Sequence, residues 1–514
     1  MKCRFLIFSL LICVFYLPAV SDDKKPNILI LYADDLGLGD LGCYNKASKI
    51  PTPHLDKLAH QGMRFTDGHS SSGICTPSRY ALLTGRYHWR DFHDIVGPMG
   101  KSVFKSERLT LPEMLQQKGY HTAAIGKWHL GWDWTALHKK EYEGLNVEQR
   151  KRKFKVRGFD GYDWSKRIPD GPLAHGFDYY FGDTVINFPP YAWIENDKLV
   201  KAPDTMMDTK KWKKIKEGNW ECRRGPMCSD WDPYQNIPVT TAKAVHYIKE
   251  QAKSEKPFFL YFAFPSPHAP IIPNDDFDGK SQAGPYGDFV FETDDACGNI
   301  LAALEESGQS DNTIVIFSAD NGPEHYAYDR DTKYGHWSSY PLRGLKRDIY
   351  EGGHRVPFIV RYPGVVKQGG VCETLVSQID IMATLAAVTG FQLSKNMAED
   401  SHDLLPIWKG EKKSVRDTHV HNTFPKAWAI RHGDWLLLEA KSGYHSRVGE
   451  TWEKKYKYPE DDKKPVELYN LAKDIEQRNN LAVQHSDRVE QLSALLKKIR
   501  DQGVSAPRLT KDKQ

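Results

Sequence analysis

The chain of 514 residues lacks long hydrophobic runs, a strong net charge and internal repeats. After residue 21, no stretch approaches the roughly 18 apolar residues that a membrane-spanning helix needs, so the sequence predicts no transmembrane anchor. The formal net charge is only +4 at pH 7, which gives no reason to expect a nucleic-acid partner or a membrane-surface partner. The sequence also has no Asn-X-Ser/Thr acceptor site. An exported animal or plant protein would often carry one, so this absence favours a bacterial origin.

The first 21 residues have the features of a secretory signal peptide. Lys2 and Arg4 are followed by an apolar run over residues 5–17 and then by small residues up to Ser21. Cleavage after this segment would lower the formal charge from +4 to +2, because the segment holds two basic residues and no acidic one. We therefore expect an exported protein, periplasmic or secreted.

Cysteine is scarce, at eight of 514 residues, and two of these lie in the predicted leader. Cys222 and Cys228 are close enough in sequence to close a small disulfide loop in an oxidising compartment, but spacing alone does not fix connectivity. Cys43, Cys297 and Cys372 are expected to be buried thiols, because unpaired cysteine behaves as a small apolar residue. The sixth cysteine lies in a segment of different character.

The segment from Cys75 to Arg86 reads C-T-P-S-R-Y-A-L-L-T-G-R and predicts a helix with an anion-binding N-terminus. Thr76 can cap this helix, and Pro77 suits its first turn because the missing N–H has no partner there in any case. Cys75 would then lie where free backbone N–H groups and the helix dipole attract negative charge. Arg79, one turn along, adds a fixed positive charge and a planar donor group.

Four apolar runs are typical of buried parallel strands, because they are continuous rather than alternating and are bounded by turn residues. They are residues 27–33, 122–125, 258–264 and 313–318. In an open α/β sheet the ligand site lies beyond the carboxyl ends of the strands. We expect the polar side chains that follow the four runs to meet in one site. These side chains are, in the order of the runs, Asp34 and Asp35, Lys127 and His129, His268, and Asp320 and Asn321.

The side chains of Asp34, Asp35, Asp320 and Asn321 offer only oxygen donors. Such a set suits a hard cation such as calcium better than zinc, whose sites usually contain His or Cys. Magnesium is the alternative. Each pair taken alone is also typical of an ordinary turn or helix cap, so the prediction of a calcium site depends on the convergence of the strands.

These motifs together resemble those of type I, formylglycine-dependent sulfatases, which are arylsulfatase-like enzymes of the alkaline-phosphatase-like superfamily. Cys-X-Pro-Ser-Arg followed by Leu-X-Thr-Gly-Arg resembles the segment in which this family oxidises the cysteine to formylglycine, and matching motifs extend over residues 26–390. The resemblance implies a sulfuric ester hydrolase and a separate maturation enzyme that generates the formylglycine. It also implies that the oxygen at position 75 completes a metal shell formed by Asp34, Asp35, Asp320 and Asn321.

The resemblance further implies roles for basic residues. Lys127 and His129 lie in G-K-W-H-L-G, His268 in S-P-H-A-P, and Lys346 in L-R-G-L-K-R-D-I-Y-E-G-G. Arg79, Lys127 and Lys346 would neutralise the sulfate, with Lys127, His268 and Lys346 in contact with the substrate. His268 would give a proton to the leaving oxygen, and His129 would later remove one from the modified side chain. Taken singly, such residues are more often structural or solvated.

We predict an α/β fold: a large, mostly parallel sheet sandwiched by helices, followed by a smaller C-terminal subdomain with an antiparallel sheet and a helix. The catalytic domain is expected over residues 22–395 and the α+β subdomain over residues 396–514, because an apolar helix at 379–388 gives way there to polar and charged sequence. Two short strands within 427–439 and an amphipathic helix at 489–499 are expected in the second part.

Aromatic and basic residues gather in two places where they could contact a sulfated sugar. These are residues 87–90 with His93, and residues 132–236, which lack clear periodicity and are expected to form long loops over the site. Such side chains stack on sugar rings and bind anionic groups. A sulfated polysaccharide or its fragments is therefore the preferred substrate, and polysaccharide degradation the expected role. The alternative is that these aromatics only pack the insertion onto the domain.

Two other functions stay open. The same superfamily includes phosphate and phosphonate ester hydrolases, although a two-zinc phosphatase would need a second set of His and Asp ligands. A catalytically inactive carbohydrate-binding relative would be expected to lack a metal ligand or a proton donor, and none is missing. A thiol retained at position 75 in protein from the native host would favour this second alternative.

The scheme predicts that Cys75→Ser protein accumulates a covalently bound sulfate and does not turn over. A hydrated aldehyde has two hydroxyls on one carbon, so one can attack sulfur while the other later allows the carbon–oxygen bond to break. Serine has only one hydroxyl. Intact-mass measurement after incubation with a sulfate ester checks this expectation, and steady turnover by the serine variant would contradict it.

Overall fold

The computed structural model describes residues 24–140, 148–149, 160–459 and 466–507. The predicted leader at 1–21 lies outside these residues, as does part of the insertion at 132–236. Within the described chain, every helix is too short or too polar to cross a membrane.

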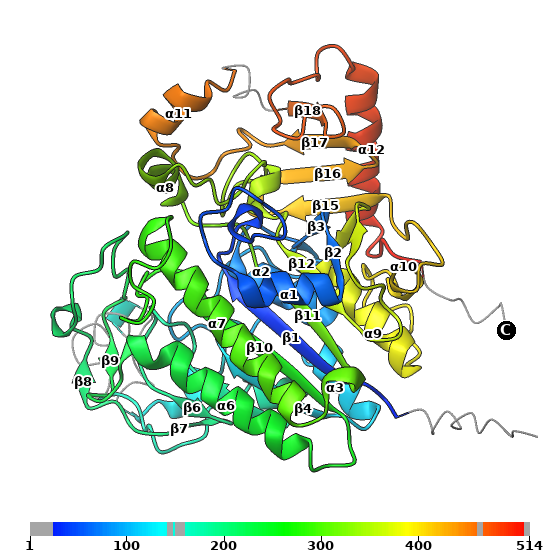
Figure 1. Cartoon of the computed structure of the whole chain (residues 1–514). Coiled ribbons are helices and arrows are strands. Elements are labelled where there is room, and N and C mark those ends of the chain that lie inside the picture. Colours follow the sequence, from blue (N-terminus) through cyan, green and yellow to red (C-terminus); the bar gives the residue numbers. More distant parts are fainter. Residues whose placement is uncertain (1–23, 141–147, 150–159, 460–465, 508–514) are drawn as a thin grey trace, which may run out of the picture.

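A twisted sheet of ten strands forms the centre of the molecule, in the order β13-β2-β12-β11-β1-β10-β4-β5-β6-β7 (Figure 1). The four predicted strands are confirmed as β1 (Asn27–Asp34), β4 (His121–Gly126), β10 (Phe258–Pro267) and β11 (Thr313–Ala319). They are adjacent and parallel, with β1 between β10 and β11, so their carboxyl ends share one edge. All residues of β1, β10 and β11 are buried, which explains their continuous apolar sequence.

Shorter strands extend the sheet on both sides. Next to β11 lie β12 (Phe358–Arg361), β2 (Met63–Phe65) and β13 (Gly370–Cys372), of which β12 is antiparallel to β11. Next to β4 lie β5 (Tyr179–Gly182), β6 (Ile194–Glu195) and β7 (Lys198–Leu199). The expectation of loops alone over 132–236 was therefore wrong in part, because these three strands lie within that range. They are too short to show an alternating pattern.

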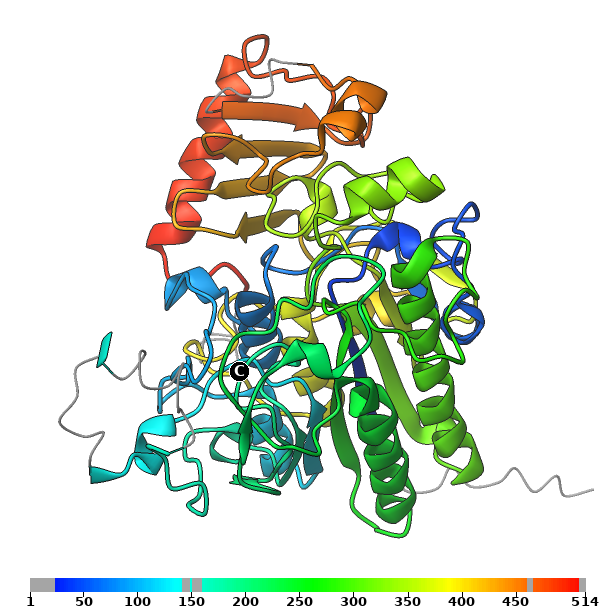
Figure 2. The same cartoon turned by 90° about the vertical axis from the view of Figure 1, so that its left-hand side faces the viewer.

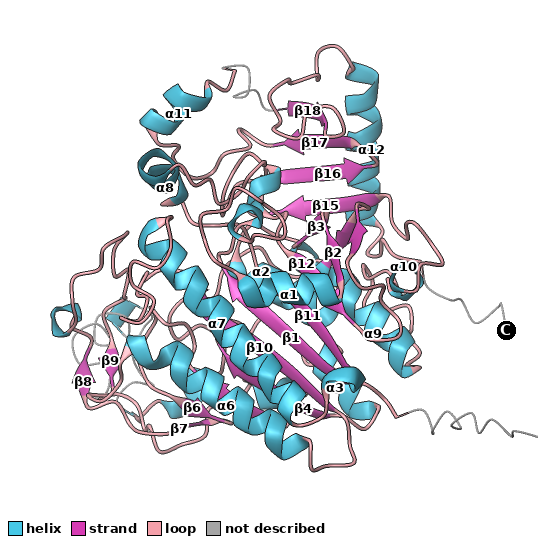
Figure 3. Cartoon of the chain, in the orientation of Figure 1, coloured by secondary structure: helices cyan, strands magenta, loops and turns pink. Residues whose placement is uncertain are grey.

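Helices cover both faces of this sheet, as predicted. On one face, α1 (Pro53–Gln61), α6 (Asn236–Gln251) and α7 (Gly284–Glu306) pack against β1 residues such as Leu29 and Leu31 (Figure 3). On the other face, α2 (Cys75–Thr84), α3 (Leu111–Gln117) and α9 (Ile381–Thr389) pack against Ile28 and Ile30. Successive side chains of β1 thus enter two separate hydrophobic cores.

A second sheet of four antiparallel strands lies beyond the large one (Figure 2). It contains β15 (Thr418–Asn422), β16 (Trp428–His432), β17 (Trp435–Glu439) and β18 (Val466–Asn470), and the final helix α12 (Ser486–Asp501) packs on it through Leu492, Leu496 and Ile499. The predicted C-terminal sheet with a helix is confirmed, whereas the exact division at residues 395 and 396 stays a prediction.

The remaining elements are short. They are the two-stranded pairs β3 (Gly68–His69) with β14 (Val376–Ser377) and β8 (Thr205–Met206) with β9 (Pro226–Met227), and the helices α8 (Ala327–Tyr334), α10 (Leu405–Trp408) and α11 (Glu450–Tyr456). All six described cysteines are free thiols, so Cys222 and Cys228 do not form the disulfide that their spacing allows.

Candidate active site

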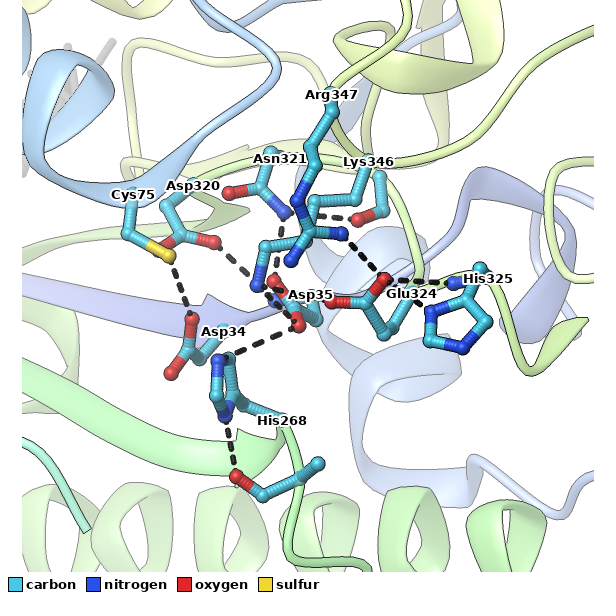
Figure 4. Close-up of polar contacts among 12 residues, drawn as sticks. Asp34, Asp35, Cys75, His268, Asp320, Asn321, Glu324, His325, Lys346 and Arg347 are labelled. Atoms are coloured by element: carbon cyan, nitrogen blue, oxygen red, sulfur yellow. Dashed lines mark hydrogen bonds and ion pairs between the residues drawn. The ribbon is translucent and has the colours of Figure 1, made fainter. Parts of the chain in front are cut away.

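The residues predicted from four strand ends, one helix start and one loop come together at the carboxyl edge of the large sheet. Figure 4 shows those that follow β1, β10 and β11, together with Cys75 and Lys346. Asp34 is the last residue of β1, and Cys75 is the first residue of α2. Two predicted residues have left-handed backbone, with φ at 64° for Asp35 and 53° for His129. Such strain is typical of functional sites. All ten side chains are buried, and they are Asp34, Asp35, Cys75, Arg79, Lys127, His129, His268, Asp320, Asn321 and Lys346.

Oxygen donors form a compact group beside Cys75. Ligand atoms of Asp34, Asp35, Cys75 and His268 all lie within 4.8 Å of one another. Asn321 donates from its amide nitrogen to Asp35 Oδ1 at 2.7 Å, while its own Oδ1 is buried without a hydrogen-bond partner. An unpartnered buried oxygen among carboxylates is a physical sign of an ion site. The donor set therefore fits a hard cation.

The protonation of these carboxyl groups shows the cost of placing them together without a cation. Burial and the nearby charge of Asp320 raise the pKa of Asp34 to about 7. Burial also raises the pKa of Asp35, although Lys346 opposes the shift. Burial has the same effect on Asp320, but the guanidinium of Arg79 overcomes it and holds the pKa below its ordinary value. A bound cation would stabilise the charged form of all three groups.

Cys75 lies at the centre, with its Sγ 3.5 Å from Asp34 Oδ1 and the side chain fully buried. Burial and the charge of Asp320 raise the pKa of this thiol well above its ordinary value. An unmodified Cys75 would therefore be a poor nucleophile, because the thiolate is the reactive form. This environment does not suit cysteine chemistry.

The predicted cap at Thr76 was wrong. The helix α2 begins at Cys75, two residues earlier than a cap at Thr76 implies, with Ile74 as its N-cap and no side-chain cap. Thr76 Oγ1 instead donates to the backbone carbonyl of His129 at 2.8 Å and accepts from the backbone N–H of Val96 at 3.1 Å. It joins α2 to the loop of His129, a tertiary contact that helix-capping rules do not describe.

Three buried cations lie against the carboxylates. Arg79 Nη2 is 2.7 Å from Asp320 Oδ2, and Lys127 Nζ is 2.5 Å from Asp34 Oδ2. Lys346 Nζ is 2.7 Å from Asp35 Oδ2. Each cation thus has a carboxylate partner, as buried charges require.

The two predicted histidines are neutral and differ in which nitrogen is available. His129 Nε2 lies 2.9 Å from the carbonyl oxygen of Val96, so this nitrogen carries the hydrogen, and Nδ1 is buried without a partner. His268 Nδ1 lies 2.5 Å from the carbonyl oxygen of Ala269, which leaves Nε2 available, 3.8 Å from Asp35 Oδ2. Burial and neighbouring cations hold the pKa of both histidines well below the ordinary value.

Sequence reasoning missed an acidic residue that binds the site's cations. Glu324 accepts a hydrogen bond from Arg347, and its Oε2 lies 3.6 Å from Lys346 Nζ (Figure 4). His325 Nδ1 is 2.8 Å from Glu324 Oε1. Proximity in sequence could have indicated both residues, since Glu324 follows Asn321 by three residues and Arg347 follows Lys346 directly.

A second missed feature is a polar wall beside His129, formed by Asp183, Thr184 and Asn187. The carbonyl oxygen of Thr184 accepts from the backbone N–H of His129 at 3.1 Å. Asp183 Oδ1, Thr184 Oγ1 and Asn187 Oδ1 are buried without hydrogen-bond partners, and burial raises the pKa of Asp183 to about 6. Unpaired buried polar atoms are costly, and the other carboxylate oxygen of Asp183 accepts from Asn236 Nδ2 at 2.7 Å.

The aromatic residues proposed for sugar binding at 87–90 have another role. Tyr87 and Trp89 are buried and stack on each other with ring centroids 5.0 Å apart, in a core that includes Trp428 of β16. They pack α2 onto the C-terminal sheet. For this segment the packing alternative is correct.

Comparisons with known proteins agree with the geometry. A family model described as Sulfatase matches residues 26–391, and a model described as N-sulphoglucosamine sulphohydrolase, C-terminal, matches residues 344–502. The chain belongs to the sulfatase family. This sulfatase is accordingly a hydrolase of sulfate esters, and the predicted enzyme class is confirmed.

Individual relatives of this sulfatase match over most of its length. It is 33% identical over 515 residues to an N-acetylgalactosamine-6-O-sulfatase of Bacteroides thetaiotaomicron, covering 93% of this chain and 94% of that protein. It is 32% identical over 423 residues to arylsulfatase A of Homo sapiens, covering 80% and 74%. A solved structure whose description concerns the metabolism of multiple glycosaminoglycans by Bacteroides thetaiotaomicron superposes with a TM-score of 0.76 at 31% identity, covering 93% and 99%.

We predict that Glu324→Gln lowers kcat/KM for sulfate ester hydrolysis about ten-fold or more, because a buried charged hydrogen bond that positions Lys346 and Arg347 is weakened. Glu399→Gln is the matched control. Glu399 also binds two arginines, Arg86 and Arg108, and its side chain has the same 7% exposure as Glu324. Steady-state kinetics and melting temperature are measured for both. Equal activity in the two variants would contradict the role of Glu324.

Proposed function

We propose that this sulfatase removes sulfate from a sulfated carbohydrate, using a hydrated formylglycine made from Cys75 and a bound calcium ion. The observation that carries the proposal is the arrangement of Arg79, Lys127 and Lys346 around position 75 at the start of α2. Positive groups fixed in a buried site can stabilise the charge that develops on sulfuryl oxygens.

The residues that would hold calcium are Asp34, Asp35, Asp320 and Asn321. When bound, a hard cation lowers the pKa of a hydroxyl that it contacts, and the formylglycine hydrate supplies such a hydroxyl as nucleophile. The unpartnered Oδ1 of Asn321 and the raised pKa of Asp34 support this assignment.

The remaining steps depend on this chain's own side chains. Arg79, Lys127 and Lys346 bind the sulfuryl oxygens and orient the ester. The negative charge of a bound ester raises the pKa of His268, so that Nε2 acquires the proton that it gives to the leaving oxygen. His129 Nδ1, whose lone pair has no partner, accepts the proton that must be removed before sulfate is released.

The polar wall supports a sugar as the leaving group. Its three unpaired acceptors need donors, and sugar hydroxyl or amide groups supply them. N-acetylgalactosamine 6-sulfate is the first sugar to test, because the Bacteroides relative that matches most of the chain carries that name.

Maturation and export are part of the same proposal. A separate enzyme would oxidise Cys75, and the leader at residues 1–21 would direct a bacterial protein to the periplasm or the exterior. The mature chain would comprise a catalytic domain over 22–395 and a C-terminal subdomain over 396–514.

The phosphatase alternative gains little support from the described residues. A two-metal site would need further ligands, and among the described residues the ring nitrogens of His69, His354 and His419 lie within 4.8 Å of one another. Arg416 Nη1 lies only 3.4 Å from His419 Nδ1. That guanidinium would repel a cation.

We predict that the enzyme hydrolyses 4-methylumbelliferyl sulfate at least about ten-fold more efficiently, by kcat/KM, than the matching phosphate. A phosphate ester brings an additional negative charge toward Asp34, Asp35 and Asp320, and each factor of ten corresponds to about 1.4 kcal/mol. Fluorescence assays of both esters measure the ratio.

A panel of defined sulfated sugars completes this test. N-acetylgalactosamine 6-sulfate should release sulfate, detected by ion chromatography. Faster cleavage of the phosphate ester, or release of sulfate from no sugar in the panel, would contradict the proposed function.

We predict that calcium raises the melting temperature of metal-depleted protein by a few degrees, because a ligand that binds only the folded state stabilises it. Asn321→Leu should weaken calcium binding at least about ten-fold in calorimetry, since it removes one oxygen donor. Asn27→Leu, at the opposite end of β1, is the control. It should keep the calcium-induced shift, and an equal loss in both variants would contradict the site.

A further inference from the structure

A groove with a volume of about 1190 Å³ lies outside the catalytic cluster. It runs between residues 424–427, at the start of β16, residues 440–448, after β17, and the first turn of α11. Ligand pockets commonly measure about 300–1,000 Å³. The groove therefore has room for an extended ligand rather than for a single small ion.

Basic residues predominate along this groove. They are Arg343, Lys426, Lys441, His445 and Arg447, against two acidic residues, Glu450 and Glu453. Lys426 and Lys441 are exposed and have no hydrogen-bond or ion-pair partner within the described residues. Arg447 is 89% exposed and only 3.8 Å from Glu450. Lys426 and Lys441 are therefore available to a ligand, whereas Arg343 is buried and donates to Tyr444 Oη at 2.8 Å, and burial lowers the pKa of His445.

The inner end of the groove contacts the active-site backbone directly. Phe424 and His445 stack there with ring centroids 3.9 Å apart. Thr423, next to Phe424, accepts a hydrogen bond from the backbone N–H of Gly73, two residues before the nucleophile, at 3.3 Å.

The loop after β17, which also lines the inner end of the groove, is attached to the loop of Lys346. The backbone N–H of His445 donates to Asp348 Oδ1 at 2.8 Å, and Ser446 Oγ donates to the carbonyl oxygen of Lys346 at 3.3 Å. These hydrogen bonds place the inner end of the groove next to the loop that carries Lys346.

We propose that the groove binds the anionic group, sulfate or carboxylate, of a sugar unit adjacent to the one that is desulfated. This inference rests on the proposed function in one respect, that the sugar being desulfated occupies the site at position 75. Arginine and lysine bind such anions through charge-assisted hydrogen bonds, and the Phe424–His445 pair offers a ring surface on which a sugar can stack. The substrate is therefore an acidic oligosaccharide rather than a single sulfated sugar.

The test measures binding by the full-length Cys75→Ala protein, which cannot consume the ligand. Tetrasaccharides of chondroitin 6-sulfate and of heparan sulfate are the probes, with free N-acetylgalactosamine 6-sulfate as the single-sugar reference. The groove variant is Lys426→Gln with Lys441→Gln. The matched control is Lys57→Gln with Lys395→Gln, two exposed lysines that do not line the groove.

We expect at least one tetrasaccharide to bind more tightly than the single sugar at low salt, and the groove variant to lose about ten-fold of that affinity. The control should stay within about two-fold of the parent protein, and added salt should reduce the difference, because exposed charges are screened. Equal affinity in groove and control variants would overturn the proposal. So would tetrasaccharides that bind no more tightly than the single sugar.

The outcome is separable from the proposed function. Turnover of 4-methylumbelliferyl sulfate by the Cys75 protein measures the chemistry without using the groove, and the groove variant in that background should keep it. If the groove variant loses tetrasaccharide binding while no protein turns over the sulfate ester, the groove proposal stands and the proposed chemistry is rejected. If turnover is full while the groove variant binds tetrasaccharides as tightly as the parent protein, the chemistry stands and the groove proposal is rejected.

Discussion

Charge balance in a buried site is the constraint on which the rest of this structure depends. Four carboxylates, of Asp34, Asp35, Asp320 and Glu324, lie out of water together with Arg79, Lys127 and Lys346. Removing one charge from such a group leaves its partner uncompensated, which costs several kcal/mol. Each side chain therefore has to be held by a rigid element. The strands β1, β4, β10 and β11 provide that rigidity, because their side chains enter two packed cores on opposite faces of the sheet.

Unpaired polar atoms accompany the ion pairs of this site. Asn321 Oδ1 and His129 Nδ1 are buried beside them without hydrogen-bond partners. Cys75 adds a thiol whose raised pKa makes it unreactive as cysteine. A buried Cys75 thiol that is unreactive as cysteine is consistent with modification of that side chain. Two independent observations favour such a modification. They are the unpaired polar atoms beside Cys75 and the formylglycine that sulfatases generally use.

Much of the site could be predicted from sequence, because a parallel strand places the next polar residue at a known edge. That rule located Asp34, Asp35, Asp320 and Asn321, and the family motif added Lys346, which no strand precedes directly. Thr76 was misassigned because capping rules describe one helix, whereas its hydroxyl contacts the loop of His129. The polar wall was missed since Asp183 and Asn187 resemble ordinary loop residues, and only three-dimensional packing shows that their oxygens lack partners. Strands of two residues, such as β6 and β7, carry too little sequence to be recognised.

The C-terminal sheet is more than an addition to a complete catalytic domain. Residues 344–391 belong to both matched family models, and this overlap contains Lys346. Loops of the small sheet contact this segment through Ser446 on the carbonyl oxygen of Lys346, and contact the start of α2 through Thr423 on Gly73. Movement of the small sheet would therefore shift Lys346 and the start of α2 together. Because a displacement of about 1 Å can cost an active site a hundred-fold in rate, an active site built on Lys346 and Cys75 would require the C-terminal sheet to be docked.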